Sequence, residues 1–182
     1  DKSRVPWSFD DFGPGTAVYR STDAGRSWRK LGGGLPTGDL GRIGLAIYPK
    51  NPDIMYATVD NANERPRTEE EAGRAAASGA AAPRSAPTPR VGGEVYRSED
   101  GGETWKKMNA DKEPIGGGKW YGQIYVDPND DQVVYVPNTP LFRSLDGGRT
   151  WGAKAPENLA GSVHVDHHAI WIDPADSRHI IL

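Results

Sequence analysis

The sequence contains no cysteine, which excludes disulfide bonds and thiolate metal sites and leaves the redox compartment open. No apolar run approaches the roughly 18 residues that a membrane-spanning helix requires. The net charge is only −3, so a broad basic surface for nucleic acid or for an anionic membrane is not expected. The chain starts with neither methionine nor a signal-peptide pattern, and we therefore expect Asp1 to be a processed or truncated start.

Glycine, proline and tryptophan are abundant. Among 182 residues there are 23 glycines, 15 prolines and six tryptophans. Frequent turns combined with many large rings are typical of a repetitive all-β protein. No P-loop, nucleophile elbow or Asn-x-Ser/Thr sequon is present.

One eight-residue pattern, Ser-x-Asp-x-Gly-x-x-Trp, occurs three times, each time after two apolar residues and an arginine. The run before it alternates as a strand does, and Asp-Gly-Gly indicates a tight turn. An Asp carboxylate accepts backbone N–H groups within such a turn, Gly tolerates a positive φ, and the Trp packs between sheets. The predicted structural residues are Ser21, Asp23, Gly25, Trp28, Ser98, Asp100, Gly102, Trp105, Ser144, Asp146, Gly148 and Trp151.

A second pattern places a proline turn between two strands, at Pro49, Pro128 and Pro174. Each unit therefore holds two strands around the proline turn and then two around the Ser-x-Asp turn. Asp100 and Asp146 are 46 residues apart, as are Pro128 and Pro174, which matches the ~40–50 residues of a propeller blade. The sequence thus predicts an all-β fold of β-propeller blades with four antiparallel strands each, and a partial propeller of about three blades' worth.

The predicted boundaries place residues 1–182 in one β-propeller domain. They comprise a half blade at 16–31, a blade at 43–109, a blade at 120–153 and a half blade at 162–182. Residues 61–92 contain no aromatic residue and almost nothing apolar, so we expect a flexible insertion, with a short helix at 69–77 as the less favoured alternative. An open row of blades leaves bare strand edges, so a longer chain or partner chains should complete the ring.

The densest group of ionisable residues is His164-Val165-Asp166-His167-His168. On a strand every second side chain shares a face, so this stretch could bind a metal, act as acid and base, or form a hydrogen-bonded lining of the central channel. We favour the lining and assign no metal or cofactor. Asp166, His168 and Asp39 are weak catalytic candidates. The candidate ligand-binding residues are His164, Asp166, His167, His168, Trp120, Tyr121 and Arg42.

Two of these candidates and one further segment have structural alternatives. Trp120 and Tyr121 could stack on sugar rings, although packing between blades is the commoner role of such residues. The segment that starts at Asp127 begins like a calcium loop but lacks the glycine and glutamate of an EF-hand, so we expect a blade turn. Hydrolysis of a glycosidic bond would require two carboxylates ~5–9 Å apart, and propellers usually supply them from distant blades.

The repeated Ser-x-Asp-x-Gly-x-x-Trp pattern resembles the Asp-box, or bacterial neuraminidase repeat, of sialidase-like, sortilin-like and oligoxyloglucan-hydrolase-like β-propellers. The runs 38–44 and 166–174 are similar to those of large secreted bacterial proteins described as sortilin N-terminal-domain or glycosyl-hydrolase-like propellers. The resemblance covers nearly the whole chain except 61–92. It implies a secreted, periplasmic or cell-surface location and a surface that binds carbohydrate or peptide.

Two functions remain open. The favoured one is an extracytoplasmic binding or scaffold module that recognises a carbohydrate or protein partner, with the rest of the propeller or partner subunits completing the ring. The alternative is a fragment of a glycoside hydrolase of the oligoxyloglucan-hydrolase type, with paired carboxylates in the channel and Asp166 as the best candidate on this piece.

Overall fold

The computed structural model describes residues 11–77, 88–109, 115, 122–139, 141–152 and 167–182. These residues form eleven strands and one helix, and every pair of named strands is antiparallel. The helix is α1 (Glu69–Ala77). The strands are β1 (Val18–Arg20), β2 (Arg29–Leu31), β3 (Leu40–Ile47), β4 (Met55–Glu64), β5 (Arg90–Ser98), β6 (Lys106–Lys107), β7 (Tyr125–Val126), β8 (Val134–Val136), β9 (Phe142–Ser144), β10 (Trp171–Ile172) and β11 (Ile180–Ile181).

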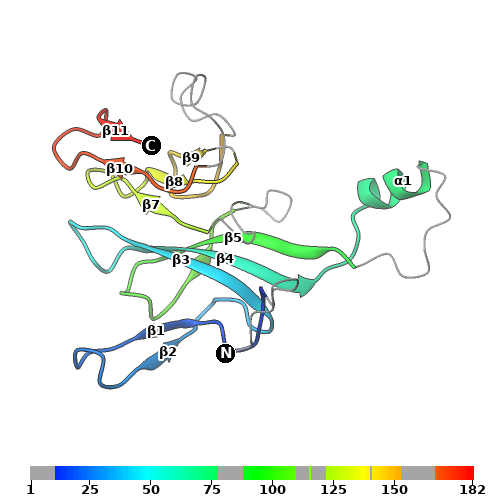
Figure 1. The fold of residues 1–182 in the computed structure, drawn as a ribbon, viewed down its shortest axis with the longest axis horizontal. Coiled ribbons are helices and arrows are strands. Elements are labelled where there is room, and N and C mark those ends of the chain that lie inside the picture. Colours follow the sequence, from blue (N-terminus) through cyan, green and yellow to red (C-terminus); the bar gives the residue numbers. More distant parts are fainter. Residues whose placement is uncertain (1–10, 78–87, 110–114, 116–121, 140, 153–166) are drawn as a thin grey trace, which may run out of the picture.

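The strands form four sheets that follow one another in a row, with the N-terminal and C-terminal hairpins at opposite ends (Figure 1). We call them half-blade A (β1-β2), blade B (β3-β4-β5-β6), blade C (β7-β8-β9) and half-blade D (β10-β11). In blade C a bridge between Arg143 and Gly152 takes the place of the fourth strand. The predicted all-β fold with four-stranded antiparallel blades, in a partial propeller, is confirmed.

Apolar side chains fill the space between successive sheets. Because neighbouring residues of a strand point to opposite faces, Tyr56 belongs to the cluster between B and C, whereas Ala57 belongs to the cluster between A and B. A third cluster, which includes Tyr135 and Leu141, lies between C and D. Blades B and C thus each contribute to two of these clusters, and their stability depends on both neighbours.

The predicted insertion at 61–92 was too wide at both ends. Strand β4 continues to Glu64, and β5 begins at Arg90, which pairs with Glu64. The polar composition did not end the strands, because the polar side chains find partners: the Asn61 amide donates to Glu94, and the Asn63 amide donates to the Thr37 carbonyl at 2.7 Å.

Helix α1 occupies the range for which a loop was favoured. Thr68 caps it reciprocally with Glu71: the Thr68 hydroxyl accepts the Glu71 N–H, and the Glu71 carboxylate accepts the Thr68 N–H at 2.9 Å. Arg65 also pairs with Glu71 and lowers the pKa of that carboxyl to about 2. The Thr-x-x-Glu spacing was the available signal for this helix.

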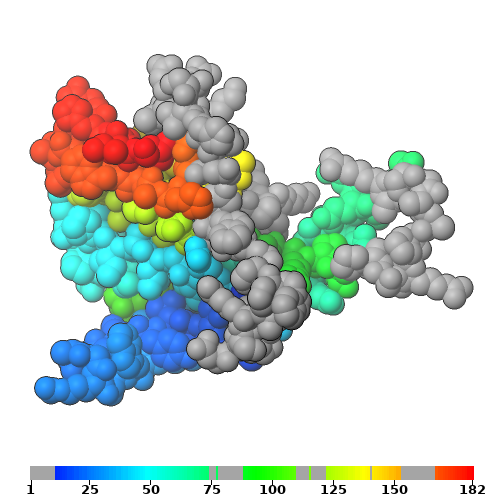
Figure 2. Space-filling model, viewed as in Figure 1, coloured from blue at the N-terminus to red at the C-terminus, as the bar shows by residue number. Residues whose placement is uncertain are grey.

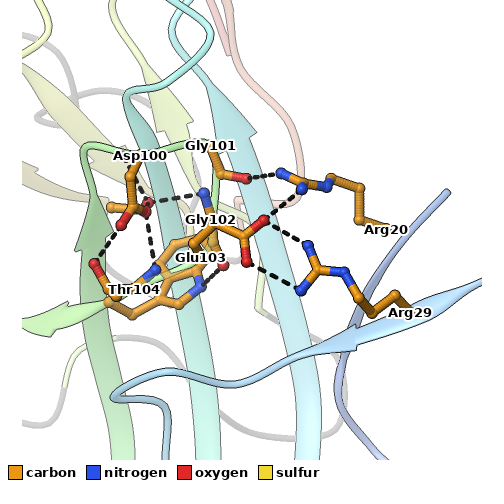
Figure 3. Close-up of polar contacts among 9 residues, drawn as sticks. Arg20, Arg29, Asp100, Gly101, Gly102, Glu103 and Thr104 are labelled. Carbon is orange, nitrogen blue, oxygen red and sulfur yellow. Dashed lines mark hydrogen bonds and ion pairs between the residues drawn. The ribbon is translucent and has the colours of Figure 1, made fainter. Parts of the chain in front are cut away.

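The three Ser-x-Asp turns share one hydrogen-bond network, of which Figure 3 shows the second copy. In each, the Ser hydroxyl donates to the Asp carboxylate at 2.8 Å and accepts the N–H of the conformationally required glycine. The same carboxylate accepts both the N–H and the hydroxyl of the residue four positions later. These bonds, led by the hydroxyl of Ser27 or Thr104, lower the pKa of Asp23 and of Asp100 to about 2.

The tryptophans that end these turns differ in burial. Trp105 is only 5% exposed and Trp151 is partly buried, but Trp28 is 63% exposed. The expectation that each tryptophan packs between sheets is therefore wrong for Trp28. Among the described residues, no sheet lies outside half-blade A to cover it.

Candidate functional site

The candidate residues gather near the ends of the sheets where β3, β7 and β10 begin. We call this the connection face and define it by residues 38–42, 61–64, 122–124, 138 and 167–168. It is opposite the proline turns and the Ser-x-Asp turns, and α1 extends from the same end of blade B (Figure 1). The strands β3, β7 and β10 are the first strands of their sheets and begin at the same end. The residues that precede them therefore lie on one face, and the sequence analysis selected them because they come just before each first strand.

Asp39 and Arg42 are both exposed at the start of β3. The Asp39 backbone carbonyl accepts the Ala62 N–H at 3.1 Å, which holds the segment to the end of β4 and leaves the carboxylate at the surface. Arg42 lies against the backbone of Gly122, since a Cβ atom there would come within 2.8 Å of the Arg42 side chain. Gly122 has a φ of +131°, so both its conformation and its contact favour glycine.

Blades B and C are in close backbone contact beside this arginine. The Gly122 carbonyl accepts the Thr58 hydroxyl at 2.8 Å, and a Cβ atom at Gly44 would lie 1.8 Å from that carbonyl oxygen. The position of residue 122, directly after Trp120 and Tyr121, is therefore set by contacts with two strands of blade B. Trp120 and Tyr121 themselves lie outside the described residues, and no contact is assigned to them.

In the histidine-rich stretch 164–168, the two described residues differ in burial. His167 is buried, and its N–H donates to the Asn138 carbonyl at 3.1 Å, which ties the start of half-blade D to the end of β8. His168 is exposed on the connection face. His164 and Asp166 lie outside the described residues. His167 is thus held by its backbone beside blade C, and the roles expected of His164, Asp166, His167 and His168 stay predictions.

Sequence reasoning missed Gln123, which follows the close contact at Gly122. Its buried Oε1 atom has no hydrogen-bond partner in the described part of the chain. An unpaired buried acceptor is costly, so such atoms often face a ligand or water. The available signal was an amide placed directly after two aromatic residues and a glycine.

Blade B also carries two buried carboxylates that the sequence analysis did not select. Glu94 is engaged within its own blade: it accepts hydrogen bonds from Asn61 at 2.8 Å and Tyr96 at 3.0 Å and pairs with Lys107 at 2.6 Å. Asp60 is on the neighbouring strand, but the register pairs Val59 with Glu94. Asp60 and Glu94 therefore point to opposite faces of the sheet. They cannot flank one sugar as a catalytic pair.

Within the described ranges, no three histidine, aspartate or glutamate side chains are grouped so as to hold a metal ion. No helix in the described part is long and apolar enough to cross a membrane. A small cavity of about 60 Å³ lies between half-blade A and blade B, lined mainly by apolar residues such as Val18, Leu35 and Val59. Ligand pockets are usually ~300–1,000 Å³, so this cavity is a packing space rather than a sugar site.

Comparison with known proteins points to one class of enzyme. No model of a known protein family matches the chain. A curated relative, xyloglucanase Xgh74A of Acetivibrio thermocellus, is 26% identical over an alignment of 171 residues, which covers 75% of this chain. The chain spans only 16% of the length of that relative.

One solved structure agrees on the fold. The GH74 xyloglucanase from Xanthomonas campestris superposes with a TM-score of 0.50 and 23% identity, covering 92% of this chain and 22% of the other. The GH74 enzyme from Niastella koreensis is more distant, with a TM-score of 0.42 and 16% identity over 72% of this chain and 17% of the other. The first of these structures supports the fold alone.

Proposed function

We propose that this chain is part of a β-propeller glycoside hydrolase that acts on a polysaccharide of the xyloglucan type. The similarity to a curated xyloglucanase over 75% of the chain carries the proposal, and the shared fold agrees with it. This reverses the preference drawn from the sequence, in which a binding or scaffold module came first. A polymeric substrate also favours the secreted or cell-surface location that the sequence resemblance implies.

In this proposal the connection face binds the sugar chain. Arg42 and His168 supply hydrogen-bonding groups at its surface, the buried Oε1 of Gln123 supplies a further acceptor, and His167 fixes the start of half-blade D. Trp120 and Tyr121 would stack on sugar rings, because pyranose faces pack well on aromatic rings. Asp166 is the proposed carboxylate on this piece, with His164 beside it and Asp39 as the weaker alternative. The second carboxylate would come from another blade.

A binding module remains the second candidate. One observation favours it: the buried acids of blade B, Asp60 and Glu94, face opposite ways, and Glu94 is held by three side chains of its own blade. A blade built in this way supports a binding surface without contributing a catalytic pair.

The test measures binding and hydrolysis separately on the native polypeptide. Binding to xyloglucan is followed by affinity electrophoresis, and hydrolysis by the release of reducing ends, with mannan as the control polymer. The matched pair is Asp166→Asn and Asp130→Asn, since Asp130 is an exposed carboxylate in the proline turn at the opposite end of blade C. We expect Asp166→Asn to abolish hydrolysis and keep binding, and Asp130→Asn to change neither.

The other outcomes separate the candidates. Binding of xyloglucan with no hydrolysis by the native polypeptide would establish the binding module. Hydrolysis that survives Asp166→Asn would keep the hydrolase and remove Asp166 from its site. A chain that neither binds nor cleaves xyloglucan contradicts the proposal.

A further inference from the structure

Strands β4 and β5 run past the end of the sheet that contains them. Strand β3 begins opposite Asn61, whereas the β4-β5 pair continues as far as Glu64 and Arg90. We call this projection the arm and define it, within the described residues, as 62–77 and 88–91. The arm rises from the connection face (Figure 1) and stands out from the body of the molecule (Figure 2). Anything that lies along the connection face therefore meets the arm at its base.

The arm is held together by one arginine. The Arg65 N–H donates to the Pro89 carbonyl at 2.9 Å, and its Nε donates to the Arg90 carbonyl at 3.1 Å. The other two guanidinium nitrogens donate to the Glu71 carboxylate at 2.8 and 2.6 Å. A two-stranded ribbon by itself is only marginally stable, so these bonds fix both α1 and the segment that carries Arg90.

Phe12 lies at the base of the arm, because the segment that contains it joins the edge of β3. Gly13 and Leu40 exchange two backbone hydrogen bonds, at 3.0 and 3.4 Å. The guanidinium carbon of Arg90 lies 4.6 Å from the centroid of the Phe12 ring, which is a cation–π contact. The ring and the guanidinium are thus placed against each other by two separate parts of the chain.

Gly41 makes room for this contact. A Cβ atom at Gly41 would lie 2.9 Å from the Cε1 atom of Phe12 and 3.0 Å from the Oδ2 atom of Asp60. The missing side chain therefore lets an aromatic edge and a carboxylate approach the same point of β3. Phe12 is only partly buried, and Arg90 is exposed. A ring, a guanidinium and a carboxylate are thus gathered on the connection face.

The charge of the arm indicates the class of ligand. An excess of one sign would attract a polymer of the opposite sign, but the formal charges of the arm cancel. An aromatic ring with a few polar groups beside it is a common composition of a site for an uncharged, partly apolar molecule such as a sugar. The charged residues are four glutamates and four arginines: Glu64, Glu69, Glu70, Glu71, Arg65, Arg67, Arg74 and Arg90.

We infer that the base of the arm binds one sugar unit of a neutral polysaccharide. The exposed part of the Phe12 ring packs on the sugar, and the N–H groups of the Arg90 guanidinium donate hydrogen bonds to its hydroxyl groups. The inference rests on the proposed function for the identity of the polymer. It adds to that function two contact residues that the sequence analysis did not select.

The test of the ring is affinity electrophoresis of the native polypeptide in gels that contain xyloglucan. Phe12→Leu keeps an apolar side chain but removes the flat ring, so it should weaken binding about fivefold, whereas Phe12→Tyr should stay within about twofold of the wild type. A role in packing alone would tolerate leucine as well as tyrosine. Gels with carboxymethyl cellulose, a charged β-glucan, should retard the wild-type chain less than xyloglucan does.

The test of the guanidinium uses a matched pair, Arg90→Gln and Arg178→Gln. Both arginines are exposed, and Arg178 lies in the proline turn between β10 and β11, at the opposite end of the sheets. Arg90→Gln should weaken binding about fivefold through the lost hydrogen bonds, and Arg178→Gln should leave binding unchanged. Arg65 is bonded to the backbone of Arg90, so Arg90→Gln should keep the urea midpoint of the wild type. This variant decides the matter if Phe12→Leu fails to fold.

The outcomes separate this inference from the proposed function. Retardation by xyloglucan that survives both Phe12→Leu and Arg90→Gln would overturn the inference and leave the proposed function intact. Equal losses in Arg90→Gln and Arg178→Gln, or stronger retardation by carboxymethyl cellulose, would also overturn it, because charge would then explain the binding. The expected losses in a polypeptide that does not cleave xyloglucan would keep the sugar contact and remove the hydrolase. A wild-type chain that xyloglucan does not retard contradicts both.

Discussion

The turns at Ser21–Trp28 and at Ser98–Trp105 have the same local structure and opposite surroundings. In both, the Ser hydroxyl donates to the Asp carboxylate at 2.8 Å, and the Trp indole N–H donates to a glycine carbonyl, at 3.1 Å in the first and 2.8 Å in the second. Yet Trp28 is 63% exposed and Trp105 is 5% exposed. The eight residues therefore determine the turn, and the neighbouring blade determines the burial.

The connection after β2 explains how Trp105 is covered. The Trp105 N–H donates to the Gly33 carbonyl at 2.6 Å, and a Cβ atom at Gly34 would lie 2.0 Å from the Trp105 carbonyl oxygen. Gly34 also has a φ of +88°. The glycine-rich connection thus permits a backbone approach that larger residues would prevent. Trp28 has no comparable neighbour in the described residues.

The largest expected difference in stability is between the tryptophans of the two turns. Trp105→Ala removes a buried ring and should lower the free energy of unfolding by about 3–5 kcal/mol. Trp28→Ala should lower it by less than about 1 kcal/mol in the monomer, because the ring is largely in water. Urea unfolding at concentrations below any self-association measures both. Equal losses would show that the first tryptophan is buried in solution.

The second comparison concerns the arginine before each turn. Arg97 is buried and reaches across to blade C, where it pairs with Asp131 at 2.5 Å; within blade B it donates to the Tyr56 hydroxyl. Arg97→Ala should cost about 3 kcal/mol, since it leaves the partly buried Asp131 carboxylate without its positively charged partner. Arg20 pairs with Glu103 at the surface (Figure 3), so Arg20→Ala should cost less and depend on salt.

The control for this pair is the salt dependence of urea unfolding. Raising the ionic strength should reduce the stability lost in Arg20→Ala and leave the loss in Arg97→Ala nearly unchanged, because only the exposed pair is screened. The interpretation fails if both variants respond alike.

The smallest expected effect concerns the aspartates, whose hydrogen bonds are the same in the two turns. The pKa of Asp23 and of Asp100 is lowered from 3.8 to about 2 by hydrogen bonds that exist only in the folded chain. Their contribution to stability is therefore present above about pH 4 and is lost as the pH falls toward 2. Asp23→Asn and Asp100→Asn should each flatten the pH dependence of unfolding between pH 5 and 2, to a similar extent. A flattening for Asp100→Asn alone would show that burial of the tryptophan, and not the local network, controls the carboxylate.

Much of the fold was predictable because its signals are local. The strand alternation, the proline turns and the Ser-x-Asp turns each occupy fewer than about ten residues and repeat with the ~40–50-residue period of a blade. The insertion was less predictable. The ends of β4 and β5 contain asparagine, glutamate and arginine, and they remain strands only because partners across the sheet satisfy those side chains.

The candidate site was predictable only as a region. Aligned first strands placed Arg42 and His168 near the connection face, but burial of His167 against Asn138 depends on where blade C ends. The sequence could not predict the hydrogen bonds of Glu94 or the unpaired oxygen of Gln123, because both depend on how neighbouring strands pack. None of these features has a fixed spacing in sequence.

The sequence by itself determined the repeat, the turns and the order of strands, because hydrogen bonds within eight residues and the two-residue period of a strand suffice for them. Only the tertiary structure decided which copies of each repeated residue are buried. Leu45 and Ile124 hold equivalent positions in the repeat, yet Leu45 is exposed and Ile124 is in a core. The physical reason is that burial requires a second surface, and the sheet next to a residue is supplied by a segment tens of residues away.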